Sequence, residues 1–525
     1  MNSEVIARLI KFSILGYLGY YHGFILVFVI NYILTYSYES LICYMFDLEA
    51  LSTAEKTFIL TPTLNKFTMT GYFVLESFSP EKIKSLIYEK AIKKFSRLRK
   101  KVIHSYGGYY WKEFPAAEAL KQIKIFPEIN LKTNEDIENY TLKQQSIPYT
   151  FNEFPYEFQV MKHGEGGIIL VKFDHCVADG IGMIGLLVAM SDNYSLDLYP
   201  KLPDISLFYK FLIHLLLPIY IIKYFITNSF LKYSNTPFRL DKDFKRTNKK
   251  KIGISKYYSF DLFNNIAKKN GITFNDLFMA TVSKVAKDFF KENDPKTNFD
   301  NKTFVGAVSV SIRPMPVCLE NHRLVNETSG QIRTFKLIDD PLKEGKEIKK
   351  VTTTAKNPFD AFAGYYIIDI LAKIVPLSII SKMMEQCINY VDIYTSNVPG
   401  PKKEIYFNGI KSTDMIVIPT ANLASFFLIV NTYGGKFQIT LNTDTGVKVC
   451  AKKFISKMEA ELEIIMNKYN DNDKGKVDNM EKVNDMEEEK NPEELKEKMN
   501  NEVKVSEKVS EKGKGKEKDK KKKKH

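Results

Sequence analysis

The stretch "GIILVKFDHCVADGIGMIGLLVAM" (167–190) places the tightest limit on how this chain can fold. Its first seven residues are apolar enough to form a buried strand, and "IGMIGLLVAM" (181–190) is typical of an apolar helix. The residues between them, "DHCVADG", therefore form a strand-to-helix turn at the end of a rigid element. Such a turn is a good place to hold a reactive side chain in one position.

Further α and β patterns run along the chain of 525 residues, and its 44% hydrophobic content is enough to build real cores. A helix is predicted after Ser79, an N-cap residue followed by proline at the first helical position. We expect two α/β lobes, 51–204 and 251–469, connected by a hydrophobic and basic segment, 205–250. The other predicted strands are 69–76, 303–312, 425–430 and 436–441, and the other helices are 261–269, 276–290 and 450–468.

The segment from Phe12 to Tyr36 contains 25 residues without a formal charge. A helix of this length crosses a hydrocarbon core of about 30 Å, since each residue adds about 1.5 Å. We therefore expect residues 1–50 to hold a membrane anchor. A cleaved signal peptide fits less well, because the apolar run is too long and no clear small-residue cleavage site follows it.

A second apolar stretch, "LFYKFLIHLLLPIYIIKYFITNSFL" (207–231), is interrupted by Lys210, Lys223 and Pro218. A membrane crossing here would place the two predicted lobes on opposite sides of the bilayer. We expect instead a membrane-surface or re-entrant segment, in which the lysines snorkel to the interface and the proline bends the helix.

The formal net charge is +14, yet the segment 471–525 holds 17 lysines against 16 acidic residues, so the excess lies in the body of the chain. One concentration, "DKDFKRTNKKKIGISK" (241–256), could meet the phosphates of a nucleotide, a lipid headgroup or nucleic acid, or could be a solvated linker. The tail, 470–525, has too few apolar residues to fold and is predicted to be disordered. Its nearly balanced charges argue against nucleic acid as a partner.

The sequence lacks the motifs of several classes of functional site. The five cysteines are far apart and form no C-x-x-C pair, so neither a zinc site nor a disulfide framework is expected, and no structural metal is predicted. The chain has no G-x-x-x-x-G-K-[ST], H-E-x-x-H or G-x-S-x-G motif. This removes the common signals of P-loop NTPases, zinc proteases and α/β-hydrolases.

Within the strand-to-helix turn, His175 stands four residues ahead of Asp179, which is followed by Gly180. A histidine there can accept a proton near neutral pH, as is needed to make a nucleophile of an alcohol hydroxyl during ester formation. The aspartate can hold the loop by accepting hydrogen bonds or by pairing with an arginine, and the glycine lets the backbone turn or approach a substrate. Alone, a short H-x-x-x-D-G match is weak evidence of an active site.

The motif resembles the H-H-x-x-x-D-G signature of the wax ester synthase/diacylglycerol acyltransferase family, within the chloramphenicol acetyltransferase-like, CoA-dependent acyltransferases. Five more segments resemble the family in the same order: "TFNDLFMA" (273–280), "VSVSIRP" (308–314), "RLVNETSG" (323–330), "TSNVPGP" (395–401) and "NTYGGKFQITLNTD" (431–444). The resemblance covers roughly residues 55–468. It implies an α/β (α+β) fold of two chloramphenicol acetyltransferase-like lobes with an active-site tunnel at their interface.

The resemblance also implies roles for single residues. His175 would be the general base that deprotonates the acceptor hydroxyl, and Asp179 would orient the loop with Arg313 as its ion-pair partner. The supporting residues would be Asn275 and Asp276 from the second lobe, Asn326 in the later asparagine segment, and Asn397, Pro399 and Gly400 in a tight loop near the interface. For these supporting residues, fold maintenance and contact with substrate both stay open.

Two departures from the family pattern bear on activity. Asp174 stands where the family has its first histidine, and the family's Pro-Leu-Trp segment is not evident, although "YYWKEFP" (109–115), with Trp111, could be its remnant. A carboxylate beside His175 would raise the pKa of the imidazole if it pointed inward, but neighbours in an extended segment face opposite ways. For the same reason we expect Cys176 to be an apolar filler rather than a nucleophile.

By resemblance, the expected function is that of a membrane-anchored O-acyltransferase. It would move a long-chain acyl group from acyl-CoA, its co-substrate, to a fatty alcohol or a diacylglycerol, giving wax ester or triacylglycerol without a further cofactor. Membrane lipid is the other expected partner. The alternative is a non-catalytic lipid-binding or scaffold protein that keeps the fold.

Two arguments about the side of the membrane on which the lobes lie give opposite answers. Arg8 and Lys11 precede the predicted anchor and acidic residues such as Glu39 follow it, so the positive-inside rule places the lobes in a lumen. Acyl-CoA is mostly cytosolic, which favours a hairpin split near residues 20–23 that returns the chain to the cytosolic face. We expect an endoplasmic reticulum membrane with the catalytic lobes on the cytosolic side.

Overall fold

The computed structural model divides into two compact units, Met1–Leu462 and Glu463–His525. The described strands and the candidate site all lie in the first unit, and the described part of the second unit, 463–468, is helical. The tail that is predicted to be disordered, 470–525, lies outside the described residues. The structure describes residues 23–60, 67–202, 205–229, 236–238, 247, 249–318, 321–374, 379–380, 382, 390–420 and 424–468.

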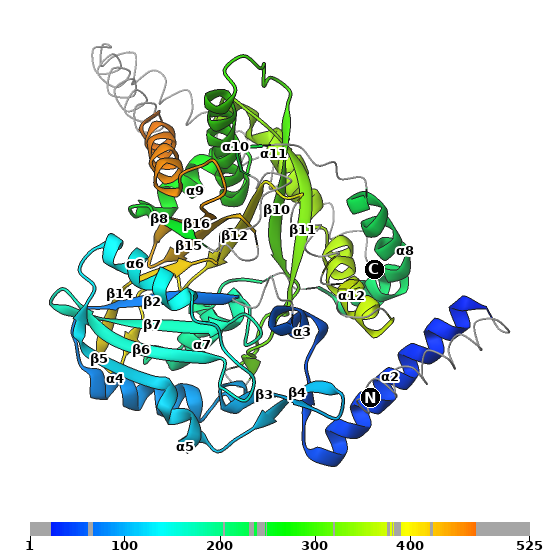
Figure 1. The fold of residues 1–525 in the computed structure, drawn as a ribbon. Helices are drawn as coiled ribbons and strands as arrows, with labels where there is room; N and C mark the ends of the chain where they lie inside the picture. The colour runs from blue at the N-terminus through cyan, green and yellow to red at the C-terminus, as the bar shows by residue number, and fades with distance from the viewer. Residues whose placement is uncertain are drawn as a thin grey trace, which may run out of the picture. The chain divides into compact units, whose positions relative to one another are not determined.

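The first sheet has six strands in the order β13-β14-β2-β7-β6-β5 (Figure 1). β7 (Gly166–Asp174) is buried from its second residue to its last, and α7 (Gly180–Met190) is buried from Ile181 to Met190. The buried strand and the apolar helix predicted from the sequence are confirmed. The other strands are β2 (Thr68–Leu75), β5 (Ile123–Asn130), β6 (Tyr156–His163), β13 (Tyr406–Phe407) and β14 (Ile410–Ile418).

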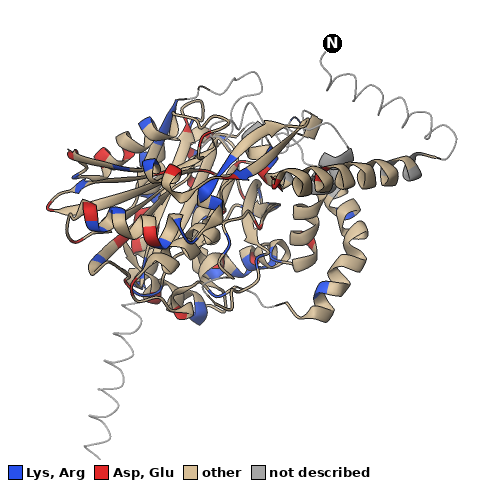
Figure 2. Ribbon diagram, turned by 90° about the horizontal axis from the view of Figure 1, so that it is seen from below, with Lys and Arg blue, Asp and Glu red and all other residues tan. Residues whose placement is uncertain are grey.

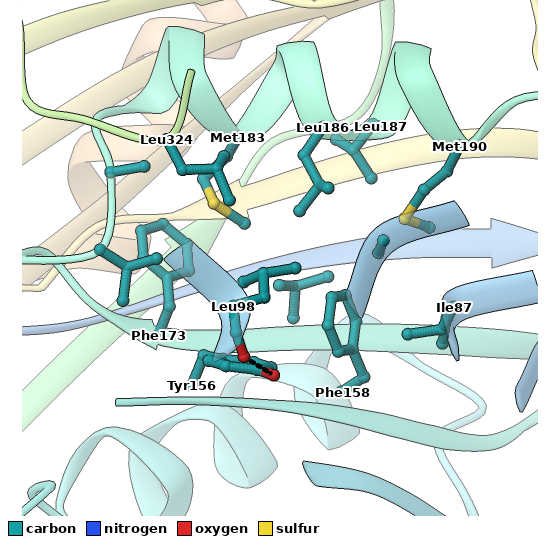
Figure 3. Packing of buried hydrophobic residues seen from close by; sticks show 14 of the residues in the cluster. Ile87, Leu98, Tyr156, Phe158, Phe173, Met183, Leu186, Leu187, Met190 and Leu324 are labelled. Carbon is teal, nitrogen blue, oxygen red and sulfur yellow. Dashed lines mark hydrogen bonds between the residues drawn. The ribbon is translucent and has the colours of Figure 1, made fainter. Parts of the chain in front are cut away.

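α7 packs on this sheet through long apolar side chains. Figure 3 shows Met183, Leu186 and Met190 projecting from α7 toward Phe158 on β6 and Phe173 on β7, and all five belong to one buried cluster. A helix that is apolar on every side is stable only when other elements cover it, as they do here. Other helices of this half include α4 (Pro80–Leu86), α5 (Ala116–Ala119) and α6 (Asn134–Gln145).

The second sheet has the order β11-β10-β12-β15-β16-β8, and β9 also pairs with β16. β12 (Ile393–Pro399) is parallel to β10 and β15, whereas β15 and β16 form the antiparallel hairpin that the sequence resemblance implies. The expected α/β fold with two lobes is confirmed, whereas the bounds of the lobes stay a prediction. Their other elements are β8 (Lys250–Ile254), β9 (Tyr258–Ser259), β10 (Thr303–Ser311), β11 (Thr328–Lys336), β15 (Phe426–Tyr433), β16 (Lys436–Asp444), α9 (Phe260–Lys269), α10 (Phe274–Asn293), α11 (Pro341–Ala355) and a helix over 451–468.

One strand crosses between the lobes. β14 belongs by sequence to the predicted 251–469 lobe, yet it pairs with β2 of the first lobe, with Ile418 opposite Thr70 and Ser412 opposite Leu75. The sequence pattern misses this strand, because "IKSTDMIVI" mixes polar and apolar residues without a period of two. The two lobes are therefore interleaved rather than consecutive in the chain.

The predicted N-terminal anchor continues into the folded unit. Residues 12–22 lie outside the described residues, and α2 (Phe24–Phe46) extends ten residues beyond Tyr36, the expected end of the span. Glu39 of α2 pairs with Lys56 of α3 (Thr53–Leu60) at 2.6 Å. A small sheet, β1-β4-β3, follows (Glu49–Ala50, Gly108–Glu113 and Lys100–Ser105), so residue 50 is not a break between domains.

The second apolar stretch is the helix α8 (Leu207–Ser229), which lies beside α12 (Pro358–Ile374) (Figure 1). Pro218 lies inside the helix, and the Nζ of Lys223 pairs with Asp360 of α12 at 2.9 Å, a contact that the sequence did not predict. α2 and α8 contain few Lys, Arg, Asp or Glu residues, which Figure 2 draws in blue and red. Among the described residues, one helical window, Leu207–Tyr224, has the length and composition of a membrane span.

Candidate active site

The turn between β7 and α7 is fixed from both ends. The His175 amide donates to the Phe67 carbonyl beside the start of β2 at 3.1 Å. Asp179 is the N-cap of α7, and its Oδ1 accepts a hydrogen bond from the Gly182 amide at 2.7 Å. An aspartate N-cap satisfies an amide that the helix leaves without a partner, which is why the helix begins at this residue.

Asp179 also joins the turn to the second lobe. Its Oδ1 lies 3.0 Å from Arg313 Nη2, so the structure has the ion pair that we expected. Its Oδ2 accepts from the Glu327 amide at 2.8 Å and from the Thr328 hydroxyl at 3.1 Å. Both charged side chains are buried, so the pair holds the turn of one lobe against the 323–328 loop of the other.

Asn326 of that loop bonds directly to His175. The imidazole Nδ1 is 2.8 Å from Asn326 Oδ1, and Asn326 Nδ2 donates to the His175 carbonyl at 2.7 Å. The second bond fixes the amide so that its oxygen faces the ring. Because an amide oxygen can only accept, Nδ1 carries the proton and Nε2 keeps its lone pair. This is the tautomer that a general base at Nε2 requires.

Two phenylalanines enclose the imidazole. The ring of Phe58, on α3, lies 4.6 Å from the His175 ring between centroids, and the ring of Phe67 meets it edge-on at 5.0 Å. Burial lowers the pKa of His175, although the charge of Asp179 and the bond to Asn326 partly oppose the shift. The lowered pKa keeps the imidazole neutral at neutral pH, ready to accept a proton.

Asp174 is next to His175 in the sequence, but its side chain does not bond to the imidazole. Its Oδ1 accepts from the Cys176 amide at 2.9 Å, so its side chain and that of His175 have different partners. Burial raises the pKa of Asp174 to about 6. Cys176 is fully buried, and burial together with Asp174 raises the pKa of its thiol, which fits the expected role of apolar filler.

The other predicted supporting residues form a separate cluster in the second lobe, and both of their expected roles, fold maintenance and contact with substrate, stay predictions. Asp276 completes a capping box with Thr273 at the start of α10, and Asn275 Oδ1 accepts from Asn397 Nδ2 at 2.6 Å. Pro399 ends β12. At Gly400 a Cβ atom would collide with the carbonyl oxygen of the paired strand.

Gly180 connects this cluster to the histidine turn. A Cβ atom at Gly180 would lie 3.4 Å from a methyl group of Val398, so the first residue of α7 packs closely on β12.

Neither Phe58 nor Phe67 was expected at the site, and no sequence signal marks them. Among the residues that the structure describes, no group of three or more His, Cys, Asp or Glu side chains is placed to hold a metal ion.

Comparison with known proteins gives a family match over part of the chain. The model of the WS/DGAT C-terminal domain matches residues 331–466, which include β12 and the β15–β16 hairpin. Over these residues the chain is similar to the wax ester synthase/diacylglycerol acyltransferase family. The O-acyltransferase WSD of Acinetobacter baylyi is 31% identical over 160 residues, which are 29% of this chain and 33% of that protein. The match thus spans about a third of this relative.

A second relative and two solved structures extend the match over more of the chain. Wax ester synthase/diacylglycerol acyltransferase 3 of Arabidopsis thaliana is 20% identical over 377 residues, covering 63% of this chain and 76% of that protein. The wax ester synthase/diacylglycerol acyltransferase of Marinobacter aquaeolei superposes with a TM-score of 0.54 at 13% identity, covering 80% of this chain and 100% of that one. The trichothecene 15-O-acetyltransferase of Fusarium sporotrichioides gives 0.58 at 11% identity, covering 80% and 94%. The structural likenesses show the shared two-lobe fold.

Replacing Asp179 tests the buried ion pair. Asp179→Asn removes the nearer of the two carboxylates that face the buried guanidinium of Arg313, the other being Glu327 at 3.6 Å. We expect it to lower the free energy of unfolding by about 1.5–3 kcal/mol, the usual contribution of a hydrogen bond to a charged group. Denaturant unfolding of both proteins measures the loss. Lys93→Gln, which breaks an exposed ion pair with Glu89, is the control and should change stability little. Equal effects of the two substitutions would contradict the account.

Replacing Asn326 tests how His175 is held. In Asn326→Asp a carboxylate faces Nδ1, and because a nearby negative charge favours imidazolium, the pKa of His175 should rise above its value in the unaltered protein. NMR titration of the His175 ring measures both values. We expect the unaltered protein to titrate below the ordinary histidine range. An unchanged pKa in the variant would show that Asn326 does not face the ring in solution.

Proposed function

We propose that the chain is an acyl-CoA-dependent O-acyltransferase that transfers a long-chain acyl group to the hydroxyl of a fatty alcohol or a diacylglycerol. The observation that carries the proposal is an enclosed histidine whose Nδ1 is bonded to Asn326 and whose Nε2 has no hydrogen-bond partner among the described residues. The names of the relatives support the reaction class, since they include O-acyltransferase and wax ester synthase/diacylglycerol acyltransferase.

The reaction needs one group that first accepts a proton and later returns it. Nε2 of His175 takes the proton of the acceptor hydroxyl as the oxygen attacks the thioester carbonyl carbon. Collapse of the tetrahedral intermediate breaks the carbon–sulfur bond, and the departing CoA thiolate takes the proton back from Nε2. The products are an ester and CoA, and the imidazole is neutral again. The enclosure by Phe58 and Phe67 would exclude water and so protect the thioester from hydrolysis.

Asp179 contributes by position and by charge. Its carboxylate oxygens are occupied by Gly182, Arg313, Glu327 and Thr328, so it is not available to accept the proton of Nδ1. Its charge still favours the imidazolium that exists while Nε2 holds the proton. The non-catalytic alternative depended on Asp174, whose carboxylate bonds to Cys176 instead of the imidazole, so no contact favours that alternative.

Activity of the purified protein tests the proposal. With labelled acyl-CoA and hexadecanol or a diacylglycerol, we expect His175→Ala to lose about 10²–10⁴-fold in rate, the usual contribution of a general base. Cys176→Ala, a change at the next residue, should keep most of the activity because that thiol only fills space. Full activity of His175→Ala would overturn the assignment, and loss of activity in Cys176→Ala alone would point to a covalent route.

We further propose that α8 lies along a membrane surface on the side where acyl-CoA is present, which favours the cytosolic face of the endoplasmic reticulum. His175 precedes α8 in the chain and Asn326 follows it, and the two are hydrogen-bonded. A single crossing of the membrane by α8 would separate them. Its outward side chains are apolar and at least half exposed: Leu207, Phe208, Phe211, Leu215, Ile219, Ile222 and Ile226. Apolar acceptors that dissolve in the bilayer would then reach the site from this side.

An environment-sensitive label tests this orientation. We expect a fluorophore on Leu215→Cys to shift to shorter wavelength with phosphatidylcholine vesicles and to be quenched by brominated lipid chains. The same label on Val317→Cys, an apolar position that is 80% exposed and outside α8, is the control and should not respond. Both variants need the native cysteines replaced by serine, except the buried Cys176. No response at position 215 would contradict the surface position of α8.

A further inference from the structure

His175 is held by two contacts that come from different parts of the chain. The ring of Phe58, on α3, lies 4.6 Å from the imidazole between centroids, and the amide of Asn326, in the 323–328 loop, bonds to Nδ1. A general base at Nε2 needs both contacts, because the ring must point at the acceptor hydroxyl and stay enclosed. One further side chain, Arg97, contacts both of the segments that supply them.

Arg97 reaches the loop through its Nε. The residue lies in a short 3₁₀ helix of the first lobe (Ser96–Arg99) and is only 8% exposed. Its Nε donates to the carbonyl of Leu324 at 3.1 Å, and Arg313 of the second lobe donates to the carbonyls on either side of Leu324. The loop that contains Asn326 is therefore held by one arginine from each lobe.

A second contact of the guanidinium reaches α3. Nη2 of Arg97 lies 3.2 Å from Oε1 of Glu55, which precedes Phe58 by three residues on that helix. Oε2 of Glu55 accepts from the Ser52 amide at 2.7 Å, and the Ser52 hydroxyl accepts from the Glu55 amide at 3.3 Å. This is a capping box, so Glu55 is fixed to the start of α3 and a shift of α3 against Arg97 would break the ion pair. The pair thus sets the position of Phe58.

Trp111, the only tryptophan of the chain, orients both partners of this ion pair. Its buried ring lies under the guanidinium, 4.3 Å from Cζ to the centroid, and its Nε1 donates to Oε2 of Glu55 at 3.4 Å. Glu49 of β1 accepts from Nη2 at 2.9 Å. Nη1 has no hydrogen-bond partner among the described residues, so Nε and Nη2 make the contacts that reach the loop and α3. A planar guanidinium serves several partners in fixed directions at once, which a lysine ammonium, a point charge on a flexible stem, does not.

We propose that Arg97 is a positioning residue for acyl transfer, because its guanidinium fixes the distance between α3 and the 323–328 loop. Through these two segments it sets Phe58 and Asn326 around the imidazole of His175. The inference rests on the proposed acyl-transfer function and adds a residue that acts through its neighbours rather than on the substrate. Its failure would leave His175 as the base.

Kinetics of two arginine variants of the full chain test the proposal. Arg99, two residues away, also pairs with a carboxylate, that of Glu113 at 2.6 Å, but its hydrogen bonds within the described residues reach neither α3 nor the loop. With acyl-CoA and hexadecanol, we expect Arg97→Lys to lower kcat by about 10²-fold, the usual effect of a misplaced catalytic group, while KM stays nearly unaltered. Arg99→Lys is the control and should change neither value. An unaltered kcat in Arg97→Lys, or an equal loss in both variants, would overturn the proposal.

NMR titration of His175 separates positioning from a plain loss of stability, because folded and unfolded molecules give separate signals. Burial is the largest cause of the lowered pKa of His175, so a ring that is less enclosed should titrate at higher pH in Arg97→Lys, even though a weaker bond to Asn326 opposes this rise. Lysine keeps the positive charge, so the change reports enclosure. Arg99→Lys should titrate like the unaltered protein. A loss of kcat with an unaltered pKa of His175 would contradict positioning by Arg97.

Glu55→Gln decides the question if Arg97→Lys does not fold. The amide has the size of the carboxylate, and Arg97 keeps Glu49 as its counter-charge, so the variant loses only the ion pair to α3. We expect the nuclear Overhauser effect between the rings of Phe58 and His175 to weaken. An unaltered effect would overturn the proposal.

The NMR measurements do not depend on turnover. A raised pKa of His175 in Arg97→Lys would support the role of Arg97 even if the unaltered protein esterified neither hexadecanol nor a diacylglycerol, and that inactivity would refute the proposed function. An active protein in which Arg97→Lys leaves the pKa of His175 unaltered would support the function and overturn the role of Arg97.

Discussion

The buried ion pair between Asp179 and Arg313 is the contact on which the geometry of the site depends. A buried pair is more stable when each group makes further hydrogen bonds, and Arg313 donates through Nη1 and Nη2 to the carbonyls of Arg323 and Val325, although its Nε has no partner among the described residues. These bonds hold the 323–328 loop against the first turn of α7. Asn326 lies in that loop, so the position of its amide, and with it the tautomer of His175, follows from the same interaction.

The exchange of β14 between the lobes adds a second constraint. A strand that pairs with β2 cannot leave without exposing the backbone groups of both. Buried amides strengthen this connection, since Asn442 of β16 donates to Gln145 of α6 at 3.0 Å and to the Pro419 carbonyl at 2.8 Å. The halves of the chain before and after α8 thus form one folded unit, and this restricts how α8 can meet a membrane. The exposed apolar helices α2 and α8 therefore lie on the outside of that unit.

The local pattern of apolar and polar residues predicted the helices and strands in which that pattern is regular. β7 and α7 are apolar along their whole length, and a glycine pair marks the turn of the β15–β16 hairpin. β14 was missed because its stability comes from pairing with β2, which no local period shows. The pairing of Arg313 with Asp179 came from the family resemblance alone. The ion pair of Lys223 with Asp360 was not predicted, because the two residues are 137 positions apart in the chain.

The site itself was predicted in part. The histidine and the N-cap aspartate are local features, whereas the bond to Asn326 spans 151 residues and the ring of Phe58 comes from another helix. Such contacts depend on the tertiary fold and leave no spacing in the sequence. Nitrogen-15 NMR of His175 near neutral pH tests the account most directly. We expect a neutral ring with the proton on Nδ1 and a bare Nε2, and a proton on Nε2 or a charged imidazolium would contradict it.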